Sequence, residues 1–207
     1  MVTTQSLLPK NFLDNHPLKV IGVDEAGRGA LAGPVVACAV SILPSFTFFD
    51  DVADSKVLTQ SKRDRIYAMI RPHIALGIGI ASHRYIDRYN ILKATLIAME
   101  KAVRRIPTQG GATVIVDGNH APRINMPCEA RVKADATVTE VMLASICAKV
   151  LRDRMMQKYH RFYPQFGFDR HKGYGTRDHY DALHKGGHSH IHRTSFNLNK
   201  QLELFQT

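Results

Sequence analysis

The sequence predicts an α/β protein in which helices cover both faces of a mixed β-sheet. Three stretches rich in β-branched residues come first, and later strand candidates then alternate with stretches whose apolar residues recur at helical spacing. The composition agrees with this class, because 44% of the 207 residues are hydrophobic and 22% are charged, as in globular proteins with a sizeable core.

The first predicted strand, residues 20–23, follows an irregular N-terminal arm, residues 1–18, and leads into the adjacent carboxylates Asp24 and Glu25. Adjacent side chains of a regular strand point to opposite faces. One metal ion could therefore bind both carboxylates only if the strand broke, or if Glu25 used its backbone carbonyl. We expect the regular strand to end by Asp24.

Four further strands are predicted by short runs of apolar and β-branched residues between turn-forming residues. These runs are residues 34–42, 74–81, 113–116 and 128–133. The first two strands of the chain share only a short turn, which predicts that they pair antiparallel.

Apolar residues at helical spacing predict four helices. They cover residues 61–71, 87–105, 138–158 and 176–184. Ser61 is the expected N-cap of the first helix, and Thr137 or Thr139 is the expected cap of the third, because hydroxyl side chains accept hydrogen bonds from the free N–H groups of a first turn.

Acidic residues lie where three of the predicted strands end, at Asp24, Asp117 and Asp135. Adjacent strands are about 4.8 Å apart, so carboxylates on neighbouring strand ends can share one cation. Clustered carboxylates are costly to desolvate without such a cation, and Mg²⁺ and Mn²⁺ prefer oxygen ligands. The pattern predicts a divalent-metal site at one edge of the sheet.

The chain is strongly basic, with 28 Lys and Arg against 18 Asp and Glu and a net charge of +10. This excess favours a polyanionic partner, either nucleic acid or an acidic membrane face. Three widely spaced cysteines without a CxxC pair fit neither a disulfide framework nor a zinc site. With no signal-peptide pattern and no apolar run long enough to span a bilayer, these features predict a cytoplasmic protein.

Gly27 and Gly29 flank Arg28 directly after the first strand. A dinucleotide-binding loop is rejected, because that fingerprint requires a helix after the glycines and here a second strand follows. Two interpretations stay open. The glycines could let the backbone approach a ribose 2′-hydroxyl while Arg28 holds a phosphate, or the segment could be an ordinary glycine turn.

The C-terminal part combines basic, aromatic and glycine residues, which suits contact with a nucleic-acid backbone. Three alternating histidines in residues 188–192 could form a metal site, but a basic, phosphate-facing or solvated tail is favoured. Asp153 lies too far from Asp135, along a helix that rises about 1.5 Å per residue, to bind the same cation. We expect a structural role for Asp153, paired with Arg152 or Arg154.

Several motifs in collinear order resemble those of the type 2 ribonucleases H, the ribonuclease HII family. They are DEAGRG at residues 24–29, DSK at 54–56, VDG at 116–118, KAD at 133–135, ASICAKV at 144–150 followed by Arg152-Asp153, HKGYGT at 171–176, and RTSF at 193–196. The resemblance extends from about Val20 to Phe196.

The resemblance implies a ribonuclease H-like, mixed five-stranded sheet with helices on both faces and a C-terminal helical extension that grips the substrate. It divides the chain into an arm (1–18), a catalytic domain (19–158) and the extension (159–207). The implied activity is hydrolysis of the RNA strand of RNA–DNA hybrids. It includes incision 5′ to single ribonucleotides embedded in duplex DNA, by a two-metal reaction that leaves 5′-phosphate and 3′-hydroxyl ends.

The resemblance also assigns site residues. Four carboxylates would be catalytic and would hold two Mg²⁺ or Mn²⁺ ions: Asp24, Glu25, Asp117 and Asp135. Substrate-binding residues would be Gly27, Arg28, Gly29, Lys56, Lys133, His171, Lys172 and Tyr174. The expected protein is a cytoplasmic monomer without membrane contact. The alternatives are a DNA junction resolvase of the same fold and a non-catalytic basic domain that binds nucleic acid.

Overall fold

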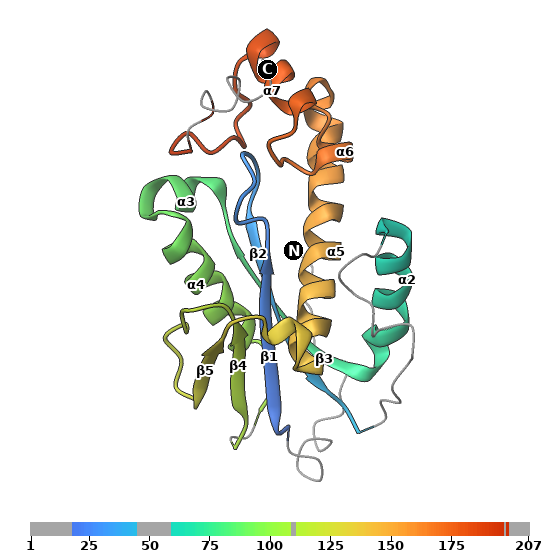
Figure 1. Ribbon diagram of the computed structural model, residues 1–207, viewed down its shortest axis with the longest axis vertical. Helices are drawn as coiled ribbons and strands as arrows, with labels where there is room; N and C mark the ends of the chain where they lie inside the picture. The colour runs from blue at the N-terminus through green and yellow to red at the C-terminus, as the bar shows by residue number, and fades with distance from the viewer. Residues whose placement is uncertain (1–17, 45–58, 109–110, 197, 199–207) are drawn as a thin grey trace.

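A computed structural model describes residues 18–44, 59–108, 111–196 and 198, and a five-stranded sheet lies at its centre (Figure 1). The strands are β1 (Val20–Ala26), β2 (Val35–Ile42), β3 (Ile74–Ala81), β4 (Thr113–Asp117) and β5 (Cys128–Arg131). Their order is β3-β2-β1-β4-β5, with β1 antiparallel to β2, β2 antiparallel to β3, and β1, β4 and β5 parallel. The predicted mixed α/β sheet is confirmed, as is the antiparallel pairing of the first two strands.

Helices and 3₁₀ turns connect and cover the strands. The α-helices are α2 (Gln60–Ile70), α3 (His83–Tyr89), α4 (Ile91–Val103), α5 (Thr139–Phe162), α6 (Phe168–His171) and α7 (Arg177–Gly186). The 3₁₀ turns are η3 (Arg71–His73), η4 (Ala134–Ala136) and η5 (Pro164–Phe166).

The sheet separates two apolar clusters, because successive side chains of each strand alternate between its faces. On one face Val23 packs with α4 residues such as Met99, and on the other Val40 packs with α5 residues such as Leu143. Helices therefore cover both faces, as predicted. Gly22 allows α5 to approach β1 closely, since a Cβ there would lie 2.2 Å from the carbonyl carbon of Glu140.

A third apolar cluster joins the segment after β1 to the C-terminal elements. Leu31 packs there with Phe166, Phe168 and Tyr180. The backbone N–H of Leu31 donates to the Gly173 carbonyl at 2.8 Å. Helix α5 runs through the predicted boundary at residue 158 and carries these elements beyond the end of the sheet (Figure 1).

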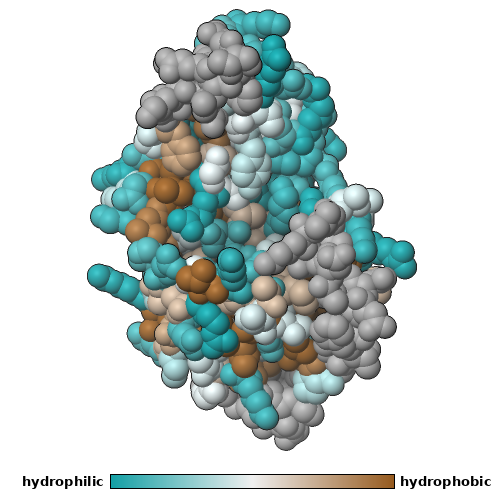
Figure 2. All heavy atoms as spheres, viewed as in Figure 1, coloured by the Kyte–Doolittle hydropathy of each residue, from teal (hydrophilic) through white to brown (hydrophobic). Residues whose placement is uncertain are grey.

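Hydrophilic residues dominate the surface over α5, α6 and α7, whereas apolar patches are interspersed with hydrophilic residues elsewhere on the same face (Figure 2). In the described part of the chain, no helix is long and apolar enough to cross a membrane.

Helix boundaries differ from the predictions at places where caps decide them. The helix predicted at 87–105 is two helices, because Asn90 has φ 73° and its side chain caps the second by accepting from the Lys93 N–H. Thr59, not Ser61, caps α2. The N-cap of α5 is Val138, which provides no side-chain hydrogen bond, so the threonine cap predicted there was wrong.

Candidate active site

The carboxyl ends of β1, β4 and β5 meet at one edge of the sheet. The parallel pairing places Val23 beside Val116, so Asp24 and Asp117 follow at neighbouring positions, and η4 brings Asp135 in directly after β5. Val116 packs toward α4, so alternation directs Asp117 to the α5 face. A pocket of about 540 Å³ opens there, lined by Arg63, Asp117, Lys133, Asp135, Ser145, Ile146 and Lys149.

Asp24 is the most buried of these carboxylates, with 8% of its surface exposed. Burial raises the pKa of Asp24 well above its usual range, and the charges of Glu25 and Asp117 raise it further. Hydrogen bonds from the Ser145 side chain and from the Glu25 backbone N–H, at 2.7 Å, favour the charged form. Asp24 is thus a carboxylate whose ionised form needs positive charge nearby.

Glu25 lies within the regular strand, so the prediction that β1 ends by Asp24 was wrong. Pairing with β2 continues, with Asp24 opposite Cys38 and Glu25 opposite Ala37. Cys38 packs toward α5 and Ala37 toward α4, so the two carboxylates lie on opposite sides of the strand. The strand continues regularly because each of these residues keeps its partner in β2.

The two carboxylate oxygens of Glu25 have different surroundings. Oε1 accepts a hydrogen bond from Arg28 at 3.3 Å, whereas Oε2 is buried without a hydrogen-bond partner. Burial raises the pKa of Glu25, Arg28 opposes this shift, and the charge of Asp117 adds to it. An unpartnered buried oxygen is costly, so this atom is suited to a cation or a hydrogen-bond donor from outside the chain.

The turn after β5 positions the remaining two acids. Lys133 adopts a left-handed conformation with φ 59°, and the next backbone N–H, of Ala134, donates to Asp117 Oδ1 at 2.8 Å. This hydrogen bond ties the end of β4 to η4, which carries Asp135. Asp117 and Asp135 therefore line the same pocket, as the strand-end pattern predicted.

The donor chemistry of this edge fits a hard divalent cation, since it provides buried carboxylate oxygens and the unpartnered Glu25 Oε2. Among the described residues, however, no group of three or more His, Cys, Asp or Glu side chains is arranged to hold a metal ion. Alternation along β1 directs Glu25 away from Asp24, Asp117 and Asp135, which lie at the same edge of the sheet.

The two glycines of the Gly27–Gly29 turn differ in what surrounds them. Gly27 has φ 98°, and a Cβ there would lie 1.9 Å from Arg152 Nε, so packing and backbone both require glycine. A Cβ on Gly29 would meet nothing within 4 Å, which leaves that position open to a ligand. Arg28 is half exposed and pairs with Glu25.

The predicted substrate residues of the C-terminal part lie around Tyr174. The Lys149 ammonium and the Arg152 guanidinium lie 5.3 Å and 5.1 Å from its ring centroid. Lys172 is buried, and its side chain donates to the Asp169 carbonyl. His171 bonds the Phe166 carbonyl at 2.6 Å and accepts from the Gly173 N–H at 3.2 Å. The predicted Lys56 lies outside the described residues.

A sequence model of the family described as Ribonuclease HII matches residues 21–199, nearly the whole described chain. The chain belongs to the ribonuclease HII family. It is 49% identical over 178 residues to ribonuclease HII of Nitrosospira multiformis, covering 86% of this chain and 88% of that protein. It is 48% identical over 198 residues to ribonuclease HII of an Acidovorax species, covering 95% and 94%.

The fold agrees with the family. The crystal structure of ribonuclease H2 from Pyrococcus horikoshii superposes with a TM-score of 0.69 at 26% identity, covering 90% of this chain and 98% of that one. The chain is therefore an endoribonuclease with the ribonuclease H fold, acting on nucleic acid, and the predicted family and enzyme class are confirmed.

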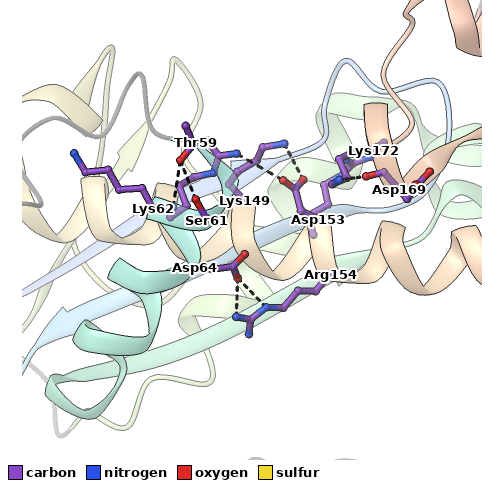
Figure 3. A network of polar contacts seen from close by, with 11 residues as sticks. Thr59, Ser61, Lys62, Asp64, Lys149, Asp153, Arg154, Asp169 and Lys172 are labelled. Carbon is purple, nitrogen blue, oxygen red and sulfur yellow. Dashed lines mark hydrogen bonds and ion pairs between the residues drawn. The ribbon is translucent and has the colours of Figure 1, made fainter.

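Beside the acids of this ribonuclease HII family member, Asp153 organises a set of cations (Figure 3). It lies on α5, pairs with Lys149 at 2.7 Å and with Arg63 at 3.9 Å, and its side chain is 5% exposed. The predicted pairing with Arg152 or Arg154 was wrong, since Arg152 binds backbone carbonyls and Arg154 pairs with Asp64 at 2.7 Å.

Two pocket residues on α5, Ser145 and Lys149, were missed by the sequence analysis, which did not use their spacing. Ser145, Lys149 and Asp153 recur every four residues and so lie on one face of the helix. That spacing was the available signal. Arg63, on α2, gave none, because its place at the pocket depends on how α2 packs against α5.

The histidines of residues 188–192 do not share one environment. His188 and His190 are exposed, but His192 is buried, so the predicted solvated tail was wrong for His192. The Ser189 N–H donates to His192 Nδ1 at 2.8 Å, the two Nε2 atoms of His192 and His179 are 3.0 Å apart, and His179 Nδ1 bonds the Tyr174 carbonyl at 2.9 Å. Neutral rings satisfy this whole chain of hydrogen bonds.

Proposed function

We propose that the protein hydrolyses the RNA strand of RNA–DNA hybrids and incises duplex DNA 5′ to single embedded ribonucleotides, leaving 5′-phosphate and 3′-hydroxyl ends. The observation that carries the proposal is the convergence of Asp24, Asp117 and Asp135 at one sheet edge, beside a pocket that basic residues also line. Acids alone would repel a phosphodiester, and bases alone would bind it without reaction.

Asp24, Glu25, Asp117 and Asp135 would hold two Mg²⁺ or Mn²⁺ ions. Support comes from the raised pKa of Asp24, the unpartnered Glu25 Oε2 and the all-oxygen donor set. When bound, such ions supply an activated water and stabilise a departing 3′-oxygen. The turn at Lys133–Ala134 would keep Asp117 and Asp135 in place, and the Ser145 hydrogen bond would favour the ionised form of Asp24.

Basic residues of the same pocket would bind the scissile strand. Arg63, Lys133 and Lys149 line it together with the acids, so their charges can hold phosphates while the carboxylates act. The open side of Gly29 would admit a ribose, and Tyr174 would pack against a sugar, with the ammonium of Lys149 5.3 Å from its ring.

The C-terminal part, residues 159–207, would act as an extension that grips the duplex next to the catalytic domain, residues 19–158. Its hydrophilic surface and its connection to the sheet through α5 support this role. We further propose a cytoplasmic monomer, in line with the three free cysteines Cys38, Cys128 and Cys147.

The deciding experiment maps the cut on a labelled DNA duplex that contains one ribonucleotide. We expect incision at the phosphate 5′ to that nucleotide, with a 5′-phosphate on the downstream product. An all-DNA duplex of the same sequence should stay intact, whereas its cleavage would favour a junction resolvase. EDTA should abolish incision, and binding without any cleavage in Mg²⁺ or Mn²⁺ would indicate a binding domain only.

A further inference from the structure

Two arginines far apart in sequence are completely buried, Arg152 on α5 and Arg193 near the C-terminus, each 0% exposed. The hydrogen bonds of Arg152 go to the backbone carbonyls of Pro34 (3.0 Å), Lys172 (2.9 Å) and Ala32 (3.1 Å). Those of Arg193 go to the carbonyls of Gly33 (3.0 Å), Arg28 (2.8 Å) and Gly27 (2.7 Å). Five of the six acceptors therefore belong to one segment, residues 27–34.

Burying two guanidinium groups side by side is unfavourable. Burial and, to a smaller extent, the charge of Arg152 lower the pKa of Arg193 to about 9. Packed apolar side chains can often replace buried charges without loss of stability. Two guanidinium groups that donate to backbone carbonyls do something that apolar side chains cannot. Because each guanidinium donates from a rigid plane, it fixes the direction of each peptide group that it bonds in the segment.

The segment held in this way connects the two parts of the site that we propose contact the ribose, the Gly27–Gly29 turn and Tyr174. It begins with Gly27, Arg28 and Gly29, and Ala30 forms an isolated β-bridge with Tyr174. The Arg152 guanidinium also lies 5.1 Å from the centroid of the Tyr174 ring. The same two side chains therefore set where the glycine turn lies and how it faces the tyrosine.

We propose that Arg152 and Arg193 are positioning residues that hold residues 27–34 against Tyr174 and thereby set the selectivity of the site for a ribose 2′-hydroxyl. The proposal rests on the proposed function, since it concerns how the same site tells ribose from deoxyribose. Neither arginine has to touch the substrate. They act by bonding the backbone carbonyls of the segment, among them those of Gly27 and Arg28. Fixing these peptide groups also fixes the directions of the backbone N–H groups of the turn and of the Arg28 side chain.

The test is Arg193→Lys, which keeps the charge but cannot bond two carbonyls from one plane. Arg154→Lys is the matched control, because Arg154 is on the surface and pairs with Asp64. Both changes are made in an Asp117→Asn background, so that binding is measured without turnover. The probes are a duplex with one ribonucleotide and the same duplex entirely of DNA, titrated in Mg²⁺.

We expect Arg193→Lys to reduce the ratio of the two affinities about tenfold, and Arg154→Lys to leave it unchanged. Arg152→Lys should reduce the ratio as Arg193→Lys does. Thermal unfolding of each variant shows at which temperatures it is folded, so that affinities are compared between folded proteins. A folded variant with an unchanged ratio, or with equal loss for both duplexes, would overturn the proposal. So would failure of both lysine variants to fold, since the arginines would then maintain the fold itself.

The two proposals can fail separately. If the unaltered enzyme does not cut 5′ to the ribonucleotide, the proposed function fails whatever the arginine variants do. If it does cut there and Arg193→Lys keeps the affinity ratio, the positioning role alone fails.

Discussion

At the scale of single residues, buried charge distinguishes this protein. Asp24, Arg152, Asp153 and Arg193 are all buried, and their charges are compensated in three different ways. Asp153 has cationic side chains, the two arginines have backbone carbonyls, and Asp24 has hydrogen bonds while its pKa is raised by burial. Among these four buried groups, Asp24 is the one whose charge a bound cation could neutralise, which supports the proposed reactive site at the sheet edge.

Replacing Asp24 or Asp117 by Asn should remove turnover, to below about a thousandth of the original kcat, while duplex binding stays largely intact. The amide keeps the size of the side chain but removes a charged oxygen ligand. Gel-based cleavage and fluorescence anisotropy measure the two effects on one duplex. Equal loss of cleavage and binding would contradict a catalytic role for these carboxylates.

The glycine turn offers a matched pair of substitutions. Gly27→Ala places a methyl group 1.9 Å from Arg152 Nε at φ 98°, so it should lower the free energy of unfolding by about 2 kcal/mol. Gly29→Ala meets nothing within 4 Å and should leave stability nearly unchanged. Urea unfolding of both variants is the measurement. A stable Gly27→Ala protein would show that the turn is less tightly packed than described.

At the scale of elements, α5 carries much of the site. One face of this helix presents Ser145 to Asp24 and Lys149 to the pocket, and Asp153 anchors Lys149 from the next turn. Gly22 lets the helix approach β1 closely enough for these contacts. The packing of α5 against β1 therefore sets the positions of Ser145 and Lys149 relative to Asp24.

Asp153→Asn should lower the free energy of unfolding by about 3 kcal/mol, because it leaves the partly buried Lys149 without its charged partner. Asp64→Asn is the control, since its pair with Arg154 is at the surface and is worth at most about 1 kcal/mol. Urea unfolding at neutral pH compares the two. Equal small effects would show that Asp153 is not an anchor.

The C-terminal histidines predict a pH dependence. Burial lowers the pKa of His179 to about 4 and of His192 to about 3, against about 6.5 in an unfolded chain. Below pH 6.5 the unfolded chain therefore binds protons that the folded chain does not, so stability is complete above pH 6.5 and falls as the pH is lowered. For His179 alone the loss should reach about 3 kcal/mol near pH 4.

Urea unfolding at several pH values between 7 and 4 measures this loss. Because carboxylates also titrate in this range, the comparison is with His192→Asn, which should show a flatter pH dependence than the unaltered protein. His190→Asn, at an exposed position, should not change the slope. Parallel curves for all three proteins would show that these buried rings do not carry the effect.

At the scale of the whole molecule, a chain with a net charge of +10 carries a site made of acids. The basic residues bring a nucleic acid to the surface, and the carboxylates at the sheet edge then need a divalent cation to admit its backbone. Binding should therefore depend steeply on salt, whereas cleavage should depend on the divalent ion.

The contribution of one pocket residue can be isolated. Lys133→Gln should reduce the slope of log affinity against log salt by about 1, the loss of one phosphate contact. Lys19→Gln, just before the start of β1 and so away from the acids, should leave the slope unchanged. Anisotropy titrations from low to moderate salt measure both, and equal slopes would remove Lys133 from the substrate path.

Much of this structure could be predicted from local patterns. The strands predicted at 74–81 and 113–116 follow from their β-branched and apolar runs, and the strand-end position of Asp117 follows with them. The break at Asn90 and the cap at Thr59 were missed, because in each case one side-chain hydrogen bond decides among several plausible caps. The end of β1 was missed for another reason, since pairing with β2 extends the strand past Glu25.

By itself, the sequence determined the order of the five strands, the strand ends that carry acids and the family, because each depends on residues close together in the chain or on collinear motifs. Only the tertiary structure decided that β1 continues past Glu25, that His192 is buried, and that Arg152 and Arg193 bind residues 27–34. Those outcomes depend on which strands pair, on which face of an element is covered, or on contacts between segments more than a hundred residues apart, and no local pattern specifies them.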